Sequence, residues 1–374
     1  KGLLVAGTEL GVYISFNDGK KWELFNLNMP VLAITDLMIK HDDLIIATQG
    51  RSFWILDDMG LLRQLDDVSN TKLYSPENST IGNWSSELNS NDSDGTSSFT
   101  GVNPANGVVI YYNIGKEDDG KKVSIKIYDE GNKLVREITS VYDSNFISYN
   151  GGPEREPVLS NKVGLNRFVW DTRHTSLIGV PYAYIEGSFR GHKAIPGKYN
   201  LILEVGNSSF NSEFEILKNP NFSVSDQDYL DLDKYATHME NNFNEMAGYI
   251  NENKKSIDKL SDMIDELDDN SEVKNNGNKL LKLMDNWDKK MMQRMSMAYD
   301  DVENFPNKFL ADYLFILDEI KGDIPNVSEG ILKSLKSHDE KWIELKKEID
   351  EINQINIPDY NNELWSNGII GALN

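Results

Sequence analysis

The sequence predicts a multidomain chain in which β structure comes first and α structure last. Three observations carry this prediction: a weak internal repeat in residues 1–68, alternating apolar segments in residues 107–218, and helical apolar spacing in residues 219–374. We expect one or two terminal β-propeller blades, then an antiparallel immunoglobulin-like sandwich, then an antiparallel helical bundle. Residues 69–106 are rich in Ser, Asn, Asp and Gly, and we expect a linker or long surface loop there.

The repeat in residues 1–68 relates LLVAGTELGVYIS, which begins at Leu3, to LIIATQGRSFWIL, which begins at Leu44. The corresponding pairs are Thr8 and Thr48, Gly11 and Gly50, and Tyr13 and Trp54. The offset of about 40 residues is the length of one propeller blade. One or two blades cannot close a ring, and they leave strand edges unpaired. We therefore expect these edges to be completed by upstream blades or by a second chain, and the start of the sequence inside a strand pattern suggests a fragment.

Within the first repeat, SFNDGKKW (Ser15 to Trp22) predicts a β-hairpin turn. The side chain of Asn17 or Asp18 can bond the backbone of the turn, and Gly19 supplies a positive φ. Trp22 can then fold onto the apolar face of the hairpin. The turn is predicted to be structural.

The predicted sandwich consists of six short alternating segments: VVIYYNI, KVSIKIYD, NKLVREI, NRFVWDT, GKYNLILEV and SEFEIL. Residues 146–159 are expected to be a long crossing loop. The expected inner-face residues are Ile110, Tyr112, Ile125, Ile127, Phe168, Trp170, Tyr199, Leu201 and Leu203.

The chain is predicted to be helical after Pro220. Ser225 with Asp228, and Asn326 with Glu329, have the spacing of helix N-terminal caps. The last helix carries apolar residues three and four apart, which is a heptad seam typical of bundle packing. The seam residues are Ile331, Leu335, His338, Trp342, Leu345, Ile349 and Ile352.

The composition argues against several classes of binding partner and of functional site. The net charge is −22 and the sequence pI is about 4.6, so we expect neither nucleic acid nor an anionic membrane surface as a partner. The chain has no cysteine, which excludes disulfides, thiolate metal sites and a cysteine nucleophile. No apolar run has the roughly 18 residues that a membrane span needs.

No catalytic residue is predicted. Glycoside hydrolysis needs two carboxylates on either side of a sugar, whereas neighbours in a strand point to opposite faces. The acidic doublets are Asp57–Asp58, Asp118–Asp119, Asp268–Asp269 and Asp300–Asp301. We expect no cofactor, although Asp36 and Asp57 could bind calcium at a loop without showing the spacing of a recognised calcium loop.

The histidines show no H-x-x-x-H or H-E-x-x-H spacing; they are His41, His174, His192, His238 and His338. WDTRH, which ends at His174, could form a metal or acid–base site. The alternative is a strand end with a buried Trp170 and an ion pair between Asp171 and Arg173. Arg51 in QGRSFW could face a ligand at the propeller axis, or it could pack across a neighbouring blade.

SFNDGKKW resembles an Asp-box, the S-x-D-x-G-x-T-W hairpin of BNR and sortilin-like β-propellers. Ser15, Gly19 and Trp22 match the motif, whereas Asn17 stands in place of Asp and Lys21 in place of Thr. TELGVYISFNDGKKW, PVLAITDLMI and ATQGRSFWILDD together resemble the final blades of large secreted bacterial propeller proteins of a glycosyl hydrolase-like family. GLNRFVWDTRH and AIPGKYNLILEV resemble the immunoglobulin-like sandwich that follows in that family, and ENFPNKFLADYLFIL resembles its helical tail.

The resemblance implies a secreted or cell-surface protein in which the Asp-box hairpin lies on the outer rim of the propeller, remote from the axis. Sialidase-like catalysis in such proteins uses a Tyr–Glu pair and an Arg cluster from several blades, and none of these can be assigned here. We therefore expect a non-catalytic C-terminal portion that braces the propeller and contacts surface proteins or glycans. The alternative is the C-terminal part of a sialidase-like glycoside hydrolase whose active site lies upstream. A third possibility is that the seam of the last helix pairs with another chain.

Overall fold

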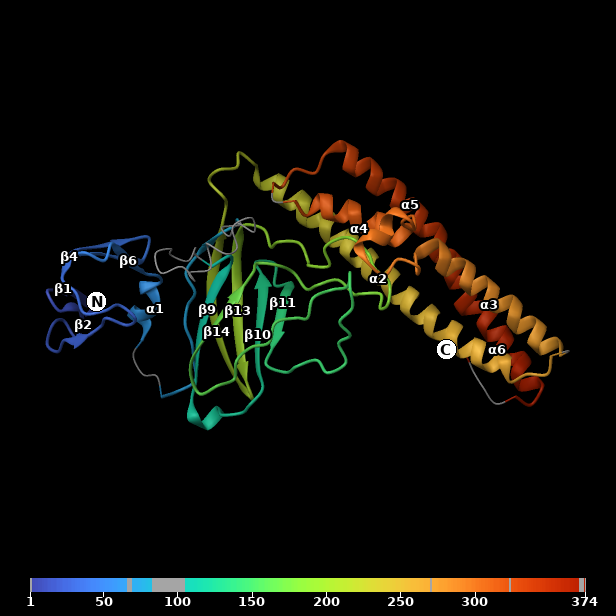
Figure 1. Cartoon of the computed structure of the whole chain (residues 1–374), viewed down its shortest axis with the longest axis horizontal. Coiled ribbons are helices and arrows are strands. Elements are labelled where there is room, and N and C mark those ends of the chain that lie inside the picture. Colours follow the sequence, from blue (N-terminus) through green and yellow to red (C-terminus); the bar gives the residue numbers. More distant parts are fainter. Residues whose placement is uncertain are drawn as a thin grey trace. The chain divides into compact units, whose positions relative to one another are not determined.

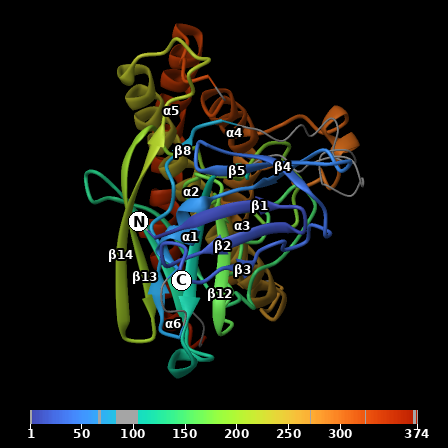
Figure 2. The same cartoon turned by 90° about the vertical axis from the view of Figure 1, so that its left-hand side faces the viewer.

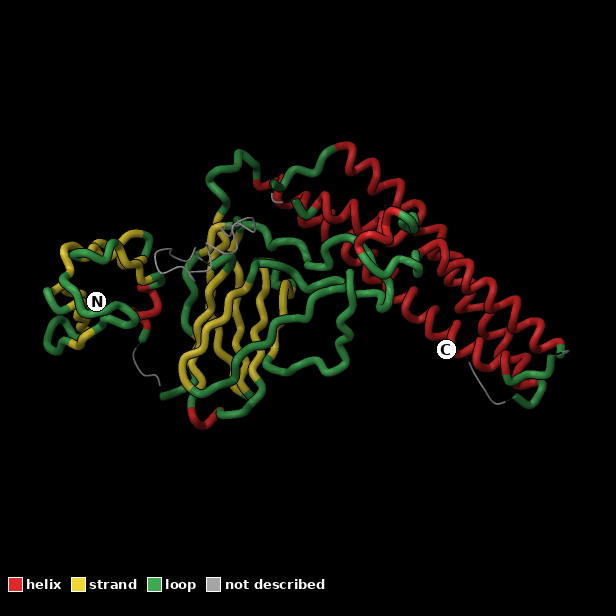
Figure 3. Tube along the Cα trace, viewed as in Figure 1, coloured by secondary structure: helices red, strands yellow, loops and turns green. Residues whose placement is uncertain are grey.

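The computed structural model of the chain describes residues 2–65, 69–82, 105–269, 271–322, 324–369 and 373. It is mixed β and α, with strands up to Leu217 and long helices from Asp226 onward (Figure 1 and Figure 3). The chain divides into two compact units. The first comprises Lys1–Tyr142, Val158–Thr172 and Pro196–Asn219, and the second comprises Asp143–Pro157, Arg173–Ile195 and Pro220–Asn374.

The first unit begins with two three-stranded antiparallel sheets, one ordered β1-β2-β3 and the other β4-β5-β6. The strands are β1 (Leu4–Thr8), β2 (Gly11–Ser15), β3 (Glu23–Leu24), β4 (Ile34–Lys40), β5 (Asp43–Thr48) and β6 (Phe53–Leu56). The sheets and the short helix α1 (Met59–Gln64) share a small apolar core: Val12, Met29, Leu44, Ile46 and Met59.

The two halves of the sequence repeat form equivalent hairpins, β1–β2 and β5–β6. In the first, the hydroxyl of Thr8 donates to the carbonyl of Gly11 at 2.9 Å, and in the second the hydroxyl of Thr48 donates to the carbonyl of Ser52 at 2.7 Å. Figure 2 shows β1 and β2 side by side. The internal repeat is therefore a structural repeat with the same hydroxyl bond across each turn.

All six strands expected in residues 107–218 are present, in two further sheets. They are β9 (Val108–Ile114), β10 (Val123–Asp129), β11 (Leu134–Thr139), β12 (Gly164–Trp170), β13 (Gly197–Val205) and β14 (Ser208–Leu217). Part of the range expected to be a linker forms two short strands, β7 (Lys72–Leu73) and β8 (Ser79–Thr80). They are strands because β7 pairs with β9 and β8 pairs with β14. The sheet orders are β11-β10-β13-β14-β8 and β12-β9-β7. Residues 83–104 of the expected linker lie outside the described residues.

These two sheets face each other across an apolar core. The ring of Trp170 on β12 lies edge-on to Tyr199 on β13 and Phe214 on β14, with ring centroids 6.0 and 6.1 Å apart. Every expected inner-face residue except Phe168 is buried, and Phe168 is half-buried. The alternating pattern therefore predicted the inward faces of these strands, and the burial of Trp170 is confirmed.

The second unit is built on helices. They are α2 (Asp226–Asp265), α3 (Glu272–Met291), α4 (Phe309–Ile320), α5 (Glu329–Glu351) and α6 (Ile357–Ser366), with a π-helical segment at Ile352–Asn356. Ser225 caps α2 in a capping box with Asp228, as predicted. The second predicted cap is wrong: α5 begins at Glu329, and the hydroxyl oxygen of Ser328 accepts from the amide of Ile331 at 3.3 Å. Ser328 is itself a favoured cap residue and stands directly before the helix.

The helices share one apolar core with a loop of the same unit. Val180, Ile185 and Phe189 from the loop at residues 173–195 are buried in the core formed by the helices. Five of the expected seam residues of α5 and the segment after it are buried in this core: Leu335, Trp342, Leu345, Ile349 and Ile352. In the described part of the chain, no helix is both apolar enough and long enough to cross a bilayer.

Candidate functional site

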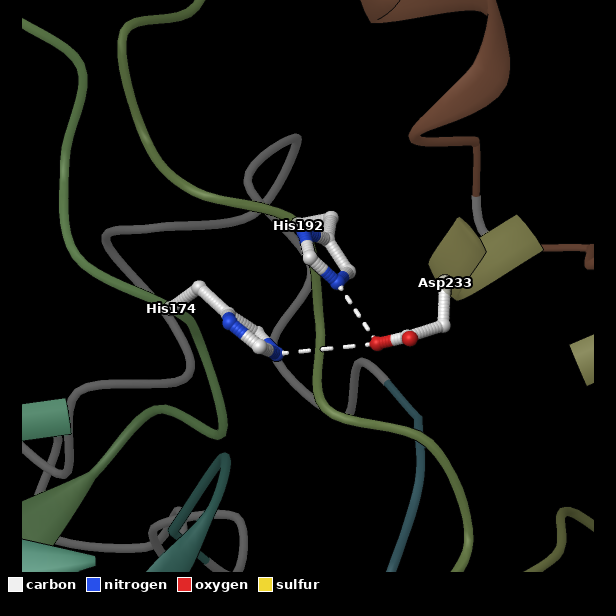
Figure 4. Close-up of side chains that lie close together, drawn as sticks. All are labelled: His174, His192 and Asp233. Carbon is white, nitrogen blue, oxygen red and sulfur yellow. Dashed lines mark hydrogen bonds and ion pairs between the residues drawn. The ribbon is translucent and has the colours of Figure 1, made fainter. Parts of the chain in front are cut away.

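Two histidines and two carboxylates meet in the second unit, where a loop lies against helix α2. His174 and His192 come from the loop, and Asp233 and Glu240 come from α2. Asp233 and Glu240 are seven residues apart, which is about two helical turns, so both side chains lie on one face of α2. Figure 4 shows both imidazoles directed at the carboxylate of Asp233.

The backbone of the loop places the two histidines side by side. The amide of His174 donates to the carbonyl of His192 at 2.9 Å, and Arg173 forms an isolated antiparallel bridge with Lys193. The guanidinium of Arg173 donates to the carbonyl of Gly191 at 2.9 Å. A side chain at Gly191 would clash, because an added Cβ would lie 2.5 Å from the carbonyl oxygen of His174. The close approach of the two loop segments therefore requires glycine at this position.

The loop is also held by the residue that follows α4. The ammonium of Lys321, whose side chain is 4% exposed, donates to the carbonyls of Ser188 at 2.8 Å and Arg190 at 3.0 Å. Burial lowers the pKa of Lys321 against the opposing effect of Asp318. The peptide that leads into His192 is thus fixed by a buried cation.

The four site residues are close enough for direct interaction. Nε2 of His192 lies 3.1 Å from Oδ1 of Asp233, and Nε2 of His174 lies 3.9 Å from the same oxygen. Nδ1 of His192 lies 2.9 Å from Oε2 of Glu240, whose other oxygen accepts the backbone amide of His192 at 2.7 Å. The two imidazole rings stack with centroids 3.9 Å apart. His192 is buried, whereas the side chain of Asp233 is 31% exposed and gives the site access to solvent.

The electrostatics of His192 follow from these contacts. Burial disfavours the charged imidazolium, but the hydrogen bonds and negative charges of Asp233 and Glu240 outweigh burial and raise the pKa of His192. The site therefore favours positive charge at this position. Among the described residues, His174, His192 and Asp233 form a group whose ligand atoms all lie within 4.8 Å of one another.

Sequence reasoning considered His174 for a metal or acid–base site but missed His192, Asp233 and Glu240 as its companions. His174 and His192 are 18 residues apart, and Asp233 is a further 41 residues along the chain. No local spacing could bring them together. The sequence feature that could have pointed to the site is the pair Asp233 and Glu240 on one face of a predicted helix. In a sequence with 60 acidic residues, such a pair is a weak signal.

The predicted hairpin residues make the bonds of a tight turn in the first unit. The hydroxyl oxygen of Ser15 accepts from the amide of Gly19 at 2.9 Å, and Oδ1 of Asn17 accepts from the amide of Lys21 at 2.8 Å. Gly19 has a φ of 81°. Trp22 is 40% exposed beside Gly19.

The remaining candidates lie apart from the histidine site in the sequence. The side chain of Arg51 is exposed, and its carbonyl accepts from the indole of Trp54 at 3.2 Å. Asp36 and Asp57 are also exposed. A member of each acidic doublet has a structural partner: Asp58 caps α1, Asp118 pairs with Lys121, Asp269 pairs with Lys274, and Asp301 accepts from the amide of Ala298.

Comparison of the chain with models of protein families, with curated protein sequences and with solved structures finds no match in any of the three.

Proposed function

We propose that this chain is a non-catalytic portion of a larger secreted or cell-surface β-propeller protein. In this proposal the two N-terminal sheets belong to propeller blades, and the facing sheets of residues 107–218 form an immunoglobulin-like sandwich. The helices of residues 219–374 form an antiparallel bundle. The sandwich and the bundle brace the propeller and mediate protein or glycan interaction. The observation that carries the proposal is that strand β6 is apolar on both of its faces.

The two faces of β6 differ in burial but not in polarity. Trp54 and Leu56 pack on the small core of the two sheets, whereas Phe53 and Ile55 on the opposite face are 72% and 62% exposed. On β4, Leu37 packs on the same core, and its neighbours Met38 and Ile39 are 52% and 53% exposed. Strands that are apolar on both faces are typical of sheets covered on both sides. A cluster of exposed apolar side chains also marks an interaction surface.

The structural repeat indicates which strands would complete these sheets. The hairpin β1–β2 corresponds to β5–β6, so the counterpart of β4 would lie along the free edge of β1. The counterpart of β3 would lie along the free edge of β6. Each sheet would then have the four strands of a propeller blade. These two added strands would also form hydrogen bonds with the backbone N–H and C=O groups along the edges of β1 and β6.

Hydroxyl-radical footprinting of the protein as isolated from its source tests this proposal. We expect Phe53 and Ile55 to be labelled several-fold less than their exposure in this chain alone predicts, because further β structure covers them. Leu165 on β12, which is 50% exposed, is the control and should be labelled freely.

Native mass spectrometry of the same material identifies the polypeptide that supplies the cover. We expect a longer chain or a second chain that carries further blades. Labelling of Phe53 equal to that of Leu165 in a lone chain would contradict the proposal. Hydrolysis of sialosides by the isolated protein would favour a glycoside hydrolase instead.

A further inference from the structure

The buried imidazole of His192 lies between two carboxylates, and this creates a hydrogen-bonding conflict. A neutral imidazole has one N–H group and one lone pair. Oε1 of Glu240 accepts from the amide of His192, and in the ionised carboxylate Oε2 is an acceptor as well. The N–H of a neutral His192 is therefore best placed on Nδ1, facing Glu240 at 2.9 Å. The lone pair on Nε2 then faces Oδ1 of Asp233, a second acceptor, at 3.1 Å.

Only a proton or a cation between Nε2 and Asp233 resolves this conflict. A proton held by His192 would make it an imidazolium ion, and a proton held by Asp233 would make that carboxyl a neutral donor. A metal ion would accept the lone pairs of both groups and leave the imidazole neutral. The second solution matches a recurrent arrangement in metalloproteins, in which a histidine that binds the metal through one nitrogen donates its other N–H to a carboxylate. Glu240 occupies that carboxylate position.

His174 adds a further donor to the same point. Its Nε2 lies 3.9 Å from Oδ1 of Asp233, and Figure 4 shows it directed at the same carboxylate as Nε2 of His192. Ligands about 2.0–2.2 Å from a tetrahedral zinc ion are separated from one another by roughly 3.3 Å. The separations of 3.1 and 3.9 Å bracket this value. The three donor atoms are thus spaced to close on one small cation with modest movement.

The donor set selects the class of metal. Two imidazole nitrogens and one carboxylate suit Zn²⁺ and related transition ions, whereas Ca²⁺ and Mg²⁺ prefer shells made of oxygen. Three protein ligands on a tetrahedral ion leave a fourth position for water or another ligand. We propose that His174, His192 and Asp233 bind one divalent transition-metal ion of the zinc class, and that Glu240 orients His192 for it.

Binding requires one local rearrangement. Two imidazoles on a single tetrahedral ion have ring centres roughly 5 Å apart, whereas those of His174 and His192 are 3.9 Å apart. The ring of His174 must therefore move away from that of His192 by roughly 1 Å. The ion would join the loop that carries both histidines to helix α2, so it should stabilise the second unit.

The test is zinc binding to the full chain after treatment with a chelator, measured by isothermal titration calorimetry with metal analysis of the dialysed protein. We expect one Zn²⁺ ion per chain. Asp233→Asn and His174→Ala should each weaken binding at least tenfold, and Glu240→Gln should weaken it about 10- to 100-fold. His238→Ala is the matched control, because His238 pairs with Asp339 away from the site and should not affect binding.

Circular dichroism of each variant shows whether it is folded, and Asp233→Asn keeps the shape of the side chain. Substitution by Co²⁺ adds a spectroscopic reading, since a tetrahedral site with nitrogen and oxygen ligands gives visible absorption that Asp233→Asn should lose. Binding that does not saturate at one ion, or that is equal in the wild type and folded Asp233→Asn, would overturn the proposal. The cluster would then be a hydrogen-bonded ion group that carries a proton.

Discussion

The carboxylate of Glu240 holds His192 at two points: it lies 2.7 Å from the backbone amide of His192 and 2.9 Å from Nδ1 of the His192 ring. Both residues are buried, and the backbone amide and Nδ1 of His192 depend on Glu240, whereas Nε2 faces Asp233. Loss of one partner from a buried charged pair leaves the other without compensation, at a cost of about 3–5 kcal/mol. We expect Glu240→Leu to lower the free energy of unfolding of the chain by about this amount, as measured by urea denaturation.

Glu240→Gln is the matched control for this prediction. The glutamine oxygen can still accept the amide of His192, so we expect a loss of only about 1–2 kcal/mol. The comparison separates hydrogen bonding from packing, since leucine and glutamine fill similar space. Equal losses in the two variants would contradict the prediction, because they would show that the hydrogen bond that glutamine can keep contributes nothing.

The fold could be predicted from the sequence where the signals are local. The strands of residues 107–218 follow from side-chain alternation, and the start of α2 follows from Ser225 and Asp228, which are three residues apart. The candidate site could not be predicted in this way. The loop that carries His174 and His192 has no period, and it contributes Val180 and Phe189 to the core of the helical unit. Its position depends on tertiary packing, which sequence spacing does not encode.

Ser15 is predicted to stabilise the hairpin between β2 and β3. Its buried hydroxyl oxygen accepts from the amides of Gly19 at 2.9 Å and Asn17 at 3.4 Å. Ser15→Ala removes these bonds and should cost about 1–2 kcal/mol of local stability. Hydrogen exchange at the amide of Gly19 should become about 5- to 30-fold faster.

The control for this hairpin is Ser209→Ala, at an exposed position on β14. We expect it to leave exchange at Gly19 unchanged. Exchange at Gly19 as slow in Ser15→Ala as in the wild type would mean that the turn is held by its backbone and by Asn17 rather than by Ser15.

Glu77 is predicted to make the stability of the first unit depend on pH. Burial and the nearby carboxylates of Asp58 and Asp42 raise the pKa of Glu77 from 4.5 to about 8. The folded state therefore binds this proton more tightly than the unfolded state does. The resulting stability is fully present below about pH 4.5 and is lost as the pH rises toward about 8. Because the side chain is partly exposed, we expect a change of about 1–2 kcal/mol.

Denaturant titrations across this range, on the wild type and on Glu77→Gln, measure the effect. Glutamine keeps the shape of the side chain and cannot ionise, so the variant should lose this part of the pH dependence and be the more stable protein near pH 8. Glu130→Gln, at an exposed position, should leave the wild-type slope unchanged. Identical slopes in the wild type and Glu77→Gln would refute the assignment.

The seam of α5 offers a test between packing within the chain and pairing with another chain. Ile349 is fully buried in the core shared by the helices, whereas Ile343 on the same helix is 68% exposed. Burying a carboxylate at position 349 leaves an unpaired charge in an apolar core, so Ile349→Asp should cost roughly 4 kcal/mol or more. Ile343→Asp places the same charge in water and should cost less than about 0.5 kcal/mol.

Thermal unfolding and light scattering of the two variants distinguish the alternatives. If the seam packs within the chain, Ile349→Asp lowers the unfolding temperature and leaves the mass in solution equal to that of the wild type. If the seam instead pairs with another chain, Ile349→Asp changes the mass in solution while the unfolding temperature stays equal to that of the wild type, and Ile343→Asp changes neither. We expect the first result, because Leu345 and Ile349 already lie in one core with Trp287 of α3, whose indole donates to the carbonyl of Leu345 at 2.8 Å.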